Sequence, residues 1–298
     1  MQPSRRTPSW GFLLIVLAAI TWGTTGATMK LVARDSPMSP LLVGFFRVAI
    51  AAPCLLLAAR GLAGPLRLPV ADVRWRLAIA GLAMGGYQVC YFYGVAKTSV
   101  AVGALIAICS APLMMIVLAA AILRERVTAA TAAALVAGVT GAALLTVGPH
   151  DLDALPRGFL VGVALALGAG LCYAVYAVLV KDVVGTVPPL LIAALTFSAA
   201  AVALTPTLAL ERVEAGPGAW ALLTYLGVVP TALAYILYVE GLRTTPVAVS
   251  GVLTLMEPLT ATLLGVAFFG DRLGVIGGLG AALLLGAVAL LTLRAPAA

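Results

Sequence analysis

The sequence predicts an all-α integral membrane protein in which ten transmembrane helices form two inverted repeats of five helices each. Three observations predict this fold class. The composition is too apolar for a soluble chain, ten separate stretches are long enough to cross a bilayer, and the two halves align with each other.

Composition separates this chain from soluble proteins. Of its 298 residues 63% are hydrophobic and 10% are charged, and the mean hydropathy is +1.14. Soluble domains carry about a quarter charged residues. The net charge of +7 is spread over the ends of apolar stretches and forms no patch, so it favours membrane orientation and no nucleic-acid partner is expected.

The residues of metal and redox chemistry are sparse. The four cysteines lie in apolar stretches and are far apart in the sequence: Cys54, Cys90, Cys109 and Cys172. They read as small buried hydrophobic residues and not as a disulfide framework or a zinc site. The one histidine, His150, is in a loop, and the sequence has no paired carboxylates. We therefore expect no enzymatic activity, no cofactor and no metal.

The apolar stretches set the number of crossings. A membrane helix needs about 20 mostly apolar residues. Ten stretches of this kind are separated by short segments with charge, proline or glycine: residues 11–33, 39–59, 75–96, 98–123, 128–147, 158–180, 187–210, 218–242, 246–269 and 274–293. The first follows two arginines as a signal peptide does, but it is too long and nine more follow, so we expect it to be retained as a helix.

Lysine and arginine are more frequent in the segments that share a side with the N-terminus, which places both termini in the cytoplasm. Residues 1–10 and 294–298 are then cytoplasmic, and residues 148–157 form an external linker. Three tryptophans stand where a span begins, as interfacial anchors do: Trp10, Trp75 and Trp220.

An internal repeat relates the two halves. Residues 97–126 align with residues 243–272 without a gap, and Pro112 falls on Pro258. Because each half crosses the membrane five times, the second half starts from the opposite side, so the repeat is inverted. The two repeats are residues 10–147 and 158–293.

Several features together resemble a known group of transporters. They are ten helices in two fives, the early Trp22-Gly23 pair, Arg47 in the second span, and the acidic ends of the fourth and ninth spans. This pattern resembles the drug/metabolite transporter superfamily and, within it, is similar to EamA-type exporters such as the bacterial aromatic amino-acid exporters of the YddG type. One departure is that Ala169-Gly170 stands where the repeat of Trp22-Gly23 is expected.

The resemblance implies export of small metabolites across the bacterial inner membrane by alternating access, with amino acids favoured and aromatic ones first. The alternatives are efflux of drugs or quaternary cations and another metabolite permease. Proton coupling stays open. The partners are a small-molecule substrate and the lipid bilayer, and the oligomeric state stays open, with a monomer as one option.

Two ionisable residues are expected near the middle of the membrane, Arg47 and Glu257. A charge there costs about 2.5–3.5 kcal/mol on insertion scales. One interpretation is an intramembrane ion pair in which each residue braces the other. The other is that Glu257 faces an aqueous path and binds a substrate ammonium group or a proton. The equivalent residue in the first half is Ala111, so the repeat itself does not require an acid.

Aromatic residues narrow the expected substrate. Tyr87 and Tyr91 are four residues apart and share a helix face, and a tyrosine ring suits a flat ligand or an ammonium group. Tyr93 and Tyr238 are expected in the interfacial belt. The expected substrate path is Trp22, Tyr87, Gln88, Tyr91, Tyr173, Tyr176 and Glu257.

Pro112 and Pro258 are expected to kink their helices at matching depths. Each proline frees the carbonyl four residues earlier, at Ile108 and at Thr254. Paired gates and static bends are both consistent with this pattern.

Overall fold

In the computed structural model, the described residues are 8–63, 69–98, 100–146, 158–269 and 274–293. Within them, the regular secondary structure is helical throughout. The expected linker at 148–157, most of the N-terminal segment 1–10 and the C-terminal segment 294–298 lie outside the described residues.

The first half contains five crossings. Four are single or nearly single helices: α1 (Pro8–Asp35), α2 (Pro40–Ala63), α3 (Ala71–Lys97) and α5 (Ala129–Thr146). The fourth crossing combines α4 (Val100–Leu118) with a π-helical turn, η1 (Ala119–Leu123). Each of the five predicted stretches of this half is thus a helix, with its ends shifted by a few residues.

The second half repeats this order with more interruptions. The helices are α6 (Phe159–Val183), α7 (Pro189–Leu204), the short α8 (Thr207–Leu210), α9 (Pro217–Gly227), α10 (Ala234–Leu242), α11 (Val247–Leu253), α12 (Met256–Phe269) and α13 (Val275–Leu293). A π-helix, η2 (Val228–Leu233), joins α9 to α10. By length and composition, seven helical stretches of the described chain are able to cross a membrane, and two shorter apolar helices accompany them.

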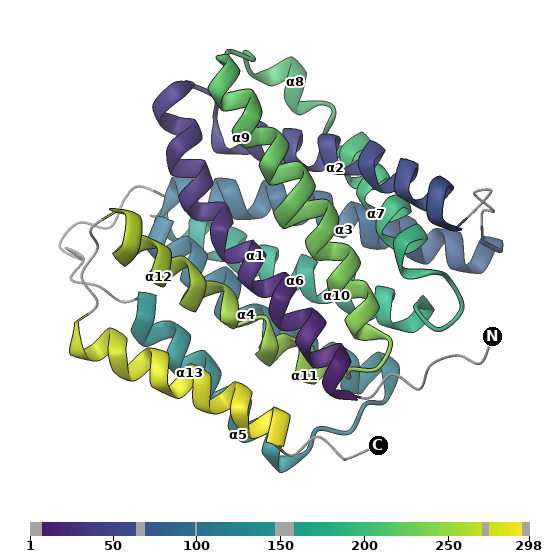
Figure 1. Cartoon of the computed structure of the whole chain (residues 1–298), viewed down its shortest axis with the longest axis vertical. Coiled ribbons are helices and arrows are strands. Elements are labelled where there is room, and N and C mark those ends of the chain that lie inside the picture. Colours follow the sequence, from purple (N-terminus) through teal and green to yellow (C-terminus); the bar gives the residue numbers. More distant parts are fainter. Residues whose placement is uncertain (1–7, 64–68, 99, 147–157, 270–273, 294–298) are drawn as a thin grey trace.

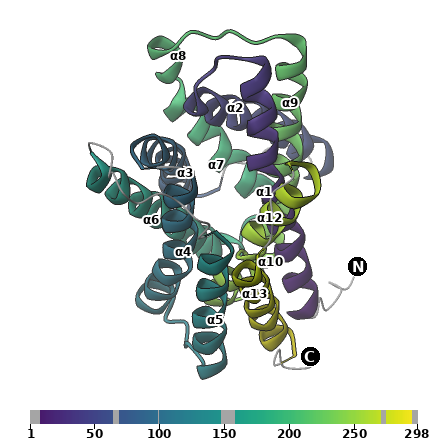
Figure 2. The same ribbon diagram turned by 90° about the vertical axis from the view of Figure 1, so that its left-hand side faces the viewer.

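The main helix contacts between the two halves have equivalents in which the corresponding helices of the two repeats trade places. α3 packs against α6 as α10 packs against α1, and α4 packs against α6 as α12 packs against α1. Two equivalent pairs contact each other across the halves, α2 with α7 and α5 with α13. Figures 1 and 2 show α5 beside α13 at one end of the molecule, with α3, α4 and α6 facing α1, α10 and α12. The two-repeat architecture predicted from the sequence is therefore present.

Two equivalent glycines let helices of the two halves approach closely. A Cβ on Gly23 of α1 would lie 2.8 Å from the Glu257 carbonyl oxygen of α12. A Cβ on Gly170 of α6 would lie 3.2 Å from the Ala107 carbonyl oxygen of α4. These contacts are tighter than ordinary van der Waals contact, so only glycine fits without a shift. Gly23 and Gly170 thus allow the same close helix contact in the two repeats, although a tryptophan precedes the glycine only in the first repeat.

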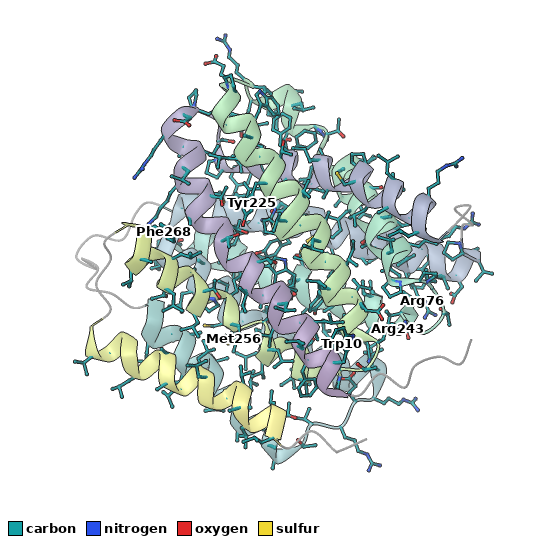
Figure 3. All side chains as sticks on the ribbon, in the orientation of Figure 1. Trp10, Arg76, Tyr225, Arg243, Met256 and Phe268 are labelled. Atoms are coloured by element: carbon teal, nitrogen blue, oxygen red, sulfur yellow. The ribbon has the colours of Figure 1, made fainter. Side chains whose placement is uncertain are left out.

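The outer surface of the bundle is apolar. Leu57, Val202 and Phe268 are more than two-thirds exposed, at 71%, 73% and 78%. Figure 3 shows Phe268 at the periphery, near the end of α12. A soluble protein rarely exposes such a surface broadly, whereas hydrocarbon covers it at no cost.

The crossings that carry Pro112 and Pro258 are interrupted at different places in the two halves. α4 continues through Pro112, whereas the ninth crossing stops at Leu253 and restarts at Met256, just before Pro258. The Thr254 carbonyl expected to be free accepts a hydrogen bond from the Glu257 amide at 3.0 Å.

A second correction concerns the four cysteines, which were predicted to be buried: all four are half-buried free thiols. Cys90 and Cys172, which are far apart in the sequence, interact across the α3–α6 contact.

Candidate substrate pocket

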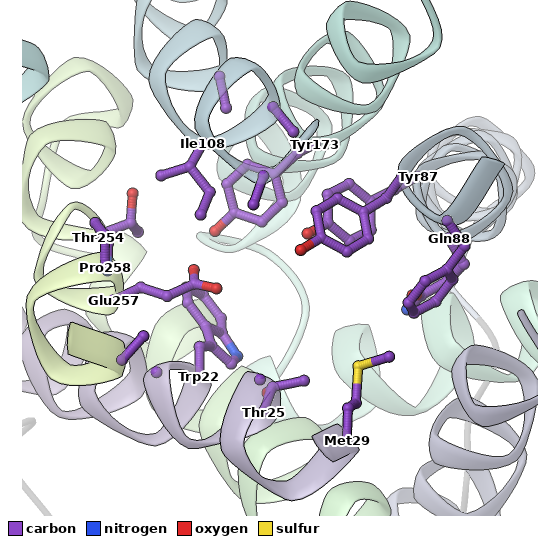
Figure 4. Close-up of a pocket in the computed structure, with 18 of the residues that line it drawn as sticks. Trp22, Thr25, Met29, Tyr87, Gln88, Ile108, Tyr173, Thr254, Glu257 and Pro258 are labelled. Carbon is purple, nitrogen blue, oxygen red and sulfur yellow. The ribbon is translucent and has the colours of Figure 1, made fainter. Parts of the chain in front are cut away.

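A pocket of about 220 Å³ lies between the two halves. Its wall includes residues of α1, α2, α3, α4, α6, α10 and α12, so both repeats contribute. Figure 4 shows Trp22 and Glu257 on one side, with Tyr87 and Gln88 of α3 on another and Tyr173 reaching in from α6. The equivalent residues Ala111 and Glu257 both line it, which places the pocket where the repeats meet.

The structure brings six of the seven expected path residues into this pocket: Trp22, Tyr87, Gln88, Tyr91, Tyr173 and Glu257. Tyr176 is the exception. It is fully buried and packs against Phe197 and Tyr235, with ring centroids 6.5 and 5.7 Å away. Tyr176 therefore supports the wall from behind and does not line the pocket.

An aromatic cluster surrounds Trp22. Its ring centroid lies 4.9 Å from that of Tyr235, 5.4 Å from Tyr238 and 6.1 Å from Tyr173. Tyr238 was expected in the interfacial belt, but it is fully buried in this cluster. The Tyr238 side chain thus points into the protein and not toward its surface, whereas Tyr93 is 43% exposed.

Tyr87 and Tyr91 form a second aromatic surface. Their rings are stacked, with centroids 5.7 Å apart and an interplanar angle of 16°. Tyr87 also contacts Tyr173, at 6.1 Å between centroids. The shared face predicted from their spacing is present. Flat rings on several sides suit a flat or cationic ligand.

Glu257 supplies the acidic side of the pocket. It lies in the first turn of α12, directly after the helix break, and its carboxylate points into the pocket (Figure 4).

Arg47 supplies the basic side. It is 8% exposed, and its Nε donates a hydrogen bond to Thr231 Oγ1 at 3.1 Å. The Thr231 hydroxyl in turn donates to the Leu226 carbonyl at 2.7 Å. Thr231 belongs to η2, and π-helical turns often occur at functional sites.

Arg47 and Glu257 line the same pocket and interact electrostatically, but no salt bridge joins them within the described chain. The ion-pair interpretation therefore has no direct contact in this structure. Both charges instead face a common space.

Several lining residues were not singled out from the sequence. Tyr235 of α10 and Thr25 and Met29 of α1 line the pocket. A weak signal existed for Tyr235, because it lies in the crossing that repeats α3, where Tyr87 and Tyr91 are found. Thr25 and Met29 follow Trp22 at helical spacing and share its face.

The pocket is closed toward the face of the molecule where α1 begins. Ile15, Ala18 and Ala19, which precede Trp22, are fully buried. The lining continues the other way along α1 to Met29, and Gly26 on this wall is exposed. A second hollow, lined by residues of α4, α5 and α12, shares Ile108 and Pro258 with the pocket. Among the described residues no cluster of three histidine, cysteine or acidic side chains could hold a metal ion.

A helical membrane protein of two repeats with a pocket between them has the architecture of a secondary transporter. The chain belongs to the EamA-like transporter family, which it matches over residues 9–147 and again over residues 160–293. The two matches cover the two repeats.

Relatives of this chain are also named as transporters. The chain is 36% identical over 276 residues to YwfM of Bacillus subtilis strain 168, named an uncharacterized transporter, covering 92% of this chain and 90% of the relative. It is 29% identical over 286 residues to an uncharacterized transporter of Archaeoglobus fulgidus, covering 95% and 96%. A solved crystal structure of a protein with 22% identity has the same fold, with a TM-score of 0.81 over 96% of this chain and 99% of the other.

Proposed function

We propose that this transporter exports small metabolites from the cytoplasm by alternating access, and that aromatic amino acids are its substrates. The observation that carries the proposal is the pocket itself, where the rings of Trp22, Tyr87, Tyr91 and Tyr173 surround a space that Glu257 also faces. Rings can stack on an aromatic side chain, and a carboxylate can bind its ammonium group.

The shape of the pocket supports one state of such a cycle. With both termini in the cytoplasm, the closed face is cytoplasmic and the lining that extends to Gly26 leads outward. The pocket then corresponds to an outward-facing state, from which substrate leaves. Exchange of the packing roles of the two repeats would open the other face, because the contacts of the halves are equivalent.

A second candidate follows from the same residues. Aromatic faces and one carboxylate also bind quaternary ammonium groups, so efflux of a drug-like cation is the alternative. Such a ligand has no carboxylate for Arg47, which also lines the pocket.

Counterflow in proteoliposomes tests the proposal. Labelled tryptophan, phenylalanine, leucine and a quaternary ammonium dye are offered side by side, with and without a pH gradient. We expect exchange of the aromatic amino acids at least tenfold faster than that of leucine. Exchange of the dye alone would support the alternative instead. Accumulation that follows the pH gradient would indicate proton coupling, and equilibration alone would indicate a facilitator.

A further inference from the structure

The charges on the pocket wall define which part of a substrate binds where. We propose that the pocket selects zwitterions: Arg47 binds the carboxylate of the substrate and Glu257 binds its ammonium group. The inference rests on the proposed function and adds to it the chemical class that the pocket accepts.

The guanidinium of Arg47 is oriented by a hydrogen bond at its Nε. Its Nε is engaged by Thr231, whose own hydroxyl is fixed on the Leu226 carbonyl. For the two terminal nitrogens, the described part of the chain provides no hydrogen bond or salt bridge. An arginine oriented through Nε presents these two nitrogens as a planar fork, the geometry that binds a carboxylate in two places.

The carboxylate of Glu257 is also uncommitted within the described residues. Its backbone amide is bonded to Thr254, but no side-chain hydrogen bond or salt bridge of the carboxylate is present there. The carboxylate faces the pocket that Arg47 also lines. One wall of the pocket therefore carries a positive charge and another a negative charge.

Two opposite charges that share a pocket without touching favour a ligand that carries both. A cation would neutralise Glu257 but would be repelled by Arg47, and an anion would do the reverse. An amino acid places a carboxylate and an ammonium group on one carbon, so it can satisfy both residues in a single pose. Charges removed from water need such partners because their burial is unfavourable.

Other residues of the pocket wall carry polar atoms that have no hydrogen-bond partner within the protein. Trp22 is 5% exposed and Gln88 is 2% exposed, and Nε1 of the first and Oε1 of the second are buried without a hydrogen-bond partner in the structure. Both residues line the pocket. These two atoms, together with Thr25 Oγ1 and Tyr173 Oη of the same pocket, are left without the partner that buried polar atoms normally have.

Three ligands that share the indole ring and its side-chain carbons but differ in their charged groups test the inference: tryptophan, tryptamine without the carboxylate, and indole-3-propionate without the ammonium group. Binding to the purified full-length protein is measured as the ligand-dependent rise in unfolding temperature in detergent, which does not require transport. For the wild type we expect tryptophan to bind at least tenfold more tightly than either analogue.

The variants separate the two contacts. In Arg47→Gln we expect the preference for tryptophan over tryptamine to fall at least tenfold. In Glu257→Gln the preference over indole-3-propionate should fall by as much. Arg60→Gln is the matched control, because Arg60 lies on the same helix but is exposed and outside the pocket, so all ratios should stay as in the wild type. If one variant does not fold, the other and the wild-type ratios still decide.

Equal binding of tryptophan and tryptamine by the wild type overturns the inference, as does an Arg47→Gln protein that folds and keeps the wild-type ratio. In both cases export of aromatic amino acids can stand. A wild type that neither binds nor exchanges any aromatic amino acid instead overturns the proposed function. The zwitterion rule is then decided with leucine and its decarboxylated analogue isoamylamine, which should bind equally if the rule is wrong.

Discussion

The carboxylate of Glu125, which follows η1 in the first repeat, accepts hydrogen bonds from the backbone amides of Val247 at 3.0 Å and Ala248 at 3.3 Å. These amides begin α11, where the first helical N–H groups have no partner within the helix. A side chain of one repeat therefore caps a helix of the other, on the face where the pocket is closed.

Replacement of Glu125 tests this cap. We expect Glu125→Ala to lower the free energy of unfolding by about 1–2 kcal/mol, because two amides lose their acceptor. Glu125→Gln keeps an acceptor oxygen and should lose less. Thermal unfolding in detergent measures both, and equal stability of Glu125→Ala and the wild type would contradict the capping role.

Lys181 binds the segment between α10 and α11, directly before the amides that Glu125 caps. Its Nζ donates to the carbonyl oxygens of Leu242 at 2.6 Å and Thr245 at 2.9 Å, at the end of α10 and just after it. We expect Lys181→Met to loosen this face, so that a cysteine placed at Val247 reacts faster with a thiol reagent. Lys181→Arg retains the donors and should react as slowly as the parent. An unchanged rate in a folded Lys181→Met protein would show that Lys181 does not hold the face closed.

The glycine contact between α1 and α12 gives a prediction with an internal control. In Gly23→Ala the new Cβ would meet the Thr260 Cβ at 2.5 Å, so α1 must move from α12, and we expect a loss of about 1–3 kcal/mol. The new Cβ of Gly26→Ala has no neighbouring atom within 4 Å, so this variant should keep its stability or gain up to about 1 kcal/mol, because alanine favours a helix more than glycine does. Chemical unfolding of the two proteins compares them. A loss of similar size in both would contradict the assignment of the effect to the contact with α12.

Trp22, which lines the pocket, and Tyr176, which lies behind its wall, should affect substrate affinity differently when they are replaced. Trp22→Phe keeps a ring but removes the Nε1 donor, which has no partner within the protein, so we expect a drop in substrate affinity. Tyr176→Phe alters a fully buried residue outside the lining, so affinity should stay within about twofold. Ligand titrations of both variants provide the comparison. A greater loss of affinity in Tyr176→Phe than in Trp22→Phe would contradict the assignment of the wall.

The spans could be predicted because length and apolar composition leave a single solution for each stretch in lipid. The repeat could be predicted because its landmarks, such as Pro112 and Pro258, align without a gap. Six pocket residues were found for a related reason: polar and aromatic side chains at mid-membrane depth are unfavourable unless they face an interior space.

The features that could not be predicted depend on the direction in which a side chain points and on contacts between helices. Tyr176 and Tyr238 have depths that the sequence indicates, but the face they occupy depends on how α6 and α10 rotate against their neighbours. The Arg47–Thr231 bond requires the π-helical turn of η2, and the proximity of Cys90 and Cys172 requires the α3–α6 contact. None of these contacts is local in sequence, so no spacing pattern records them.

The central claim is that the pocket between the repeats is the substrate path, and a cysteine at Gly26 tests it most directly. Gly26→Cys places a thiol on the exposed part of the pocket wall with no atom nearby to displace. Its rate of labelling by a membrane-impermeant thiol reagent is measured with and without tryptophan, and Arg212→Cys, at an exposed position between α8 and α9 and outside the pocket, is the control. The wild type sets the background from its own four cysteines. We predict that tryptophan slows labelling at residue 26 and leaves labelling at residue 212 unchanged. Transport of tryptophan with equal labelling rates at residue 26 in its presence and absence would contradict the account.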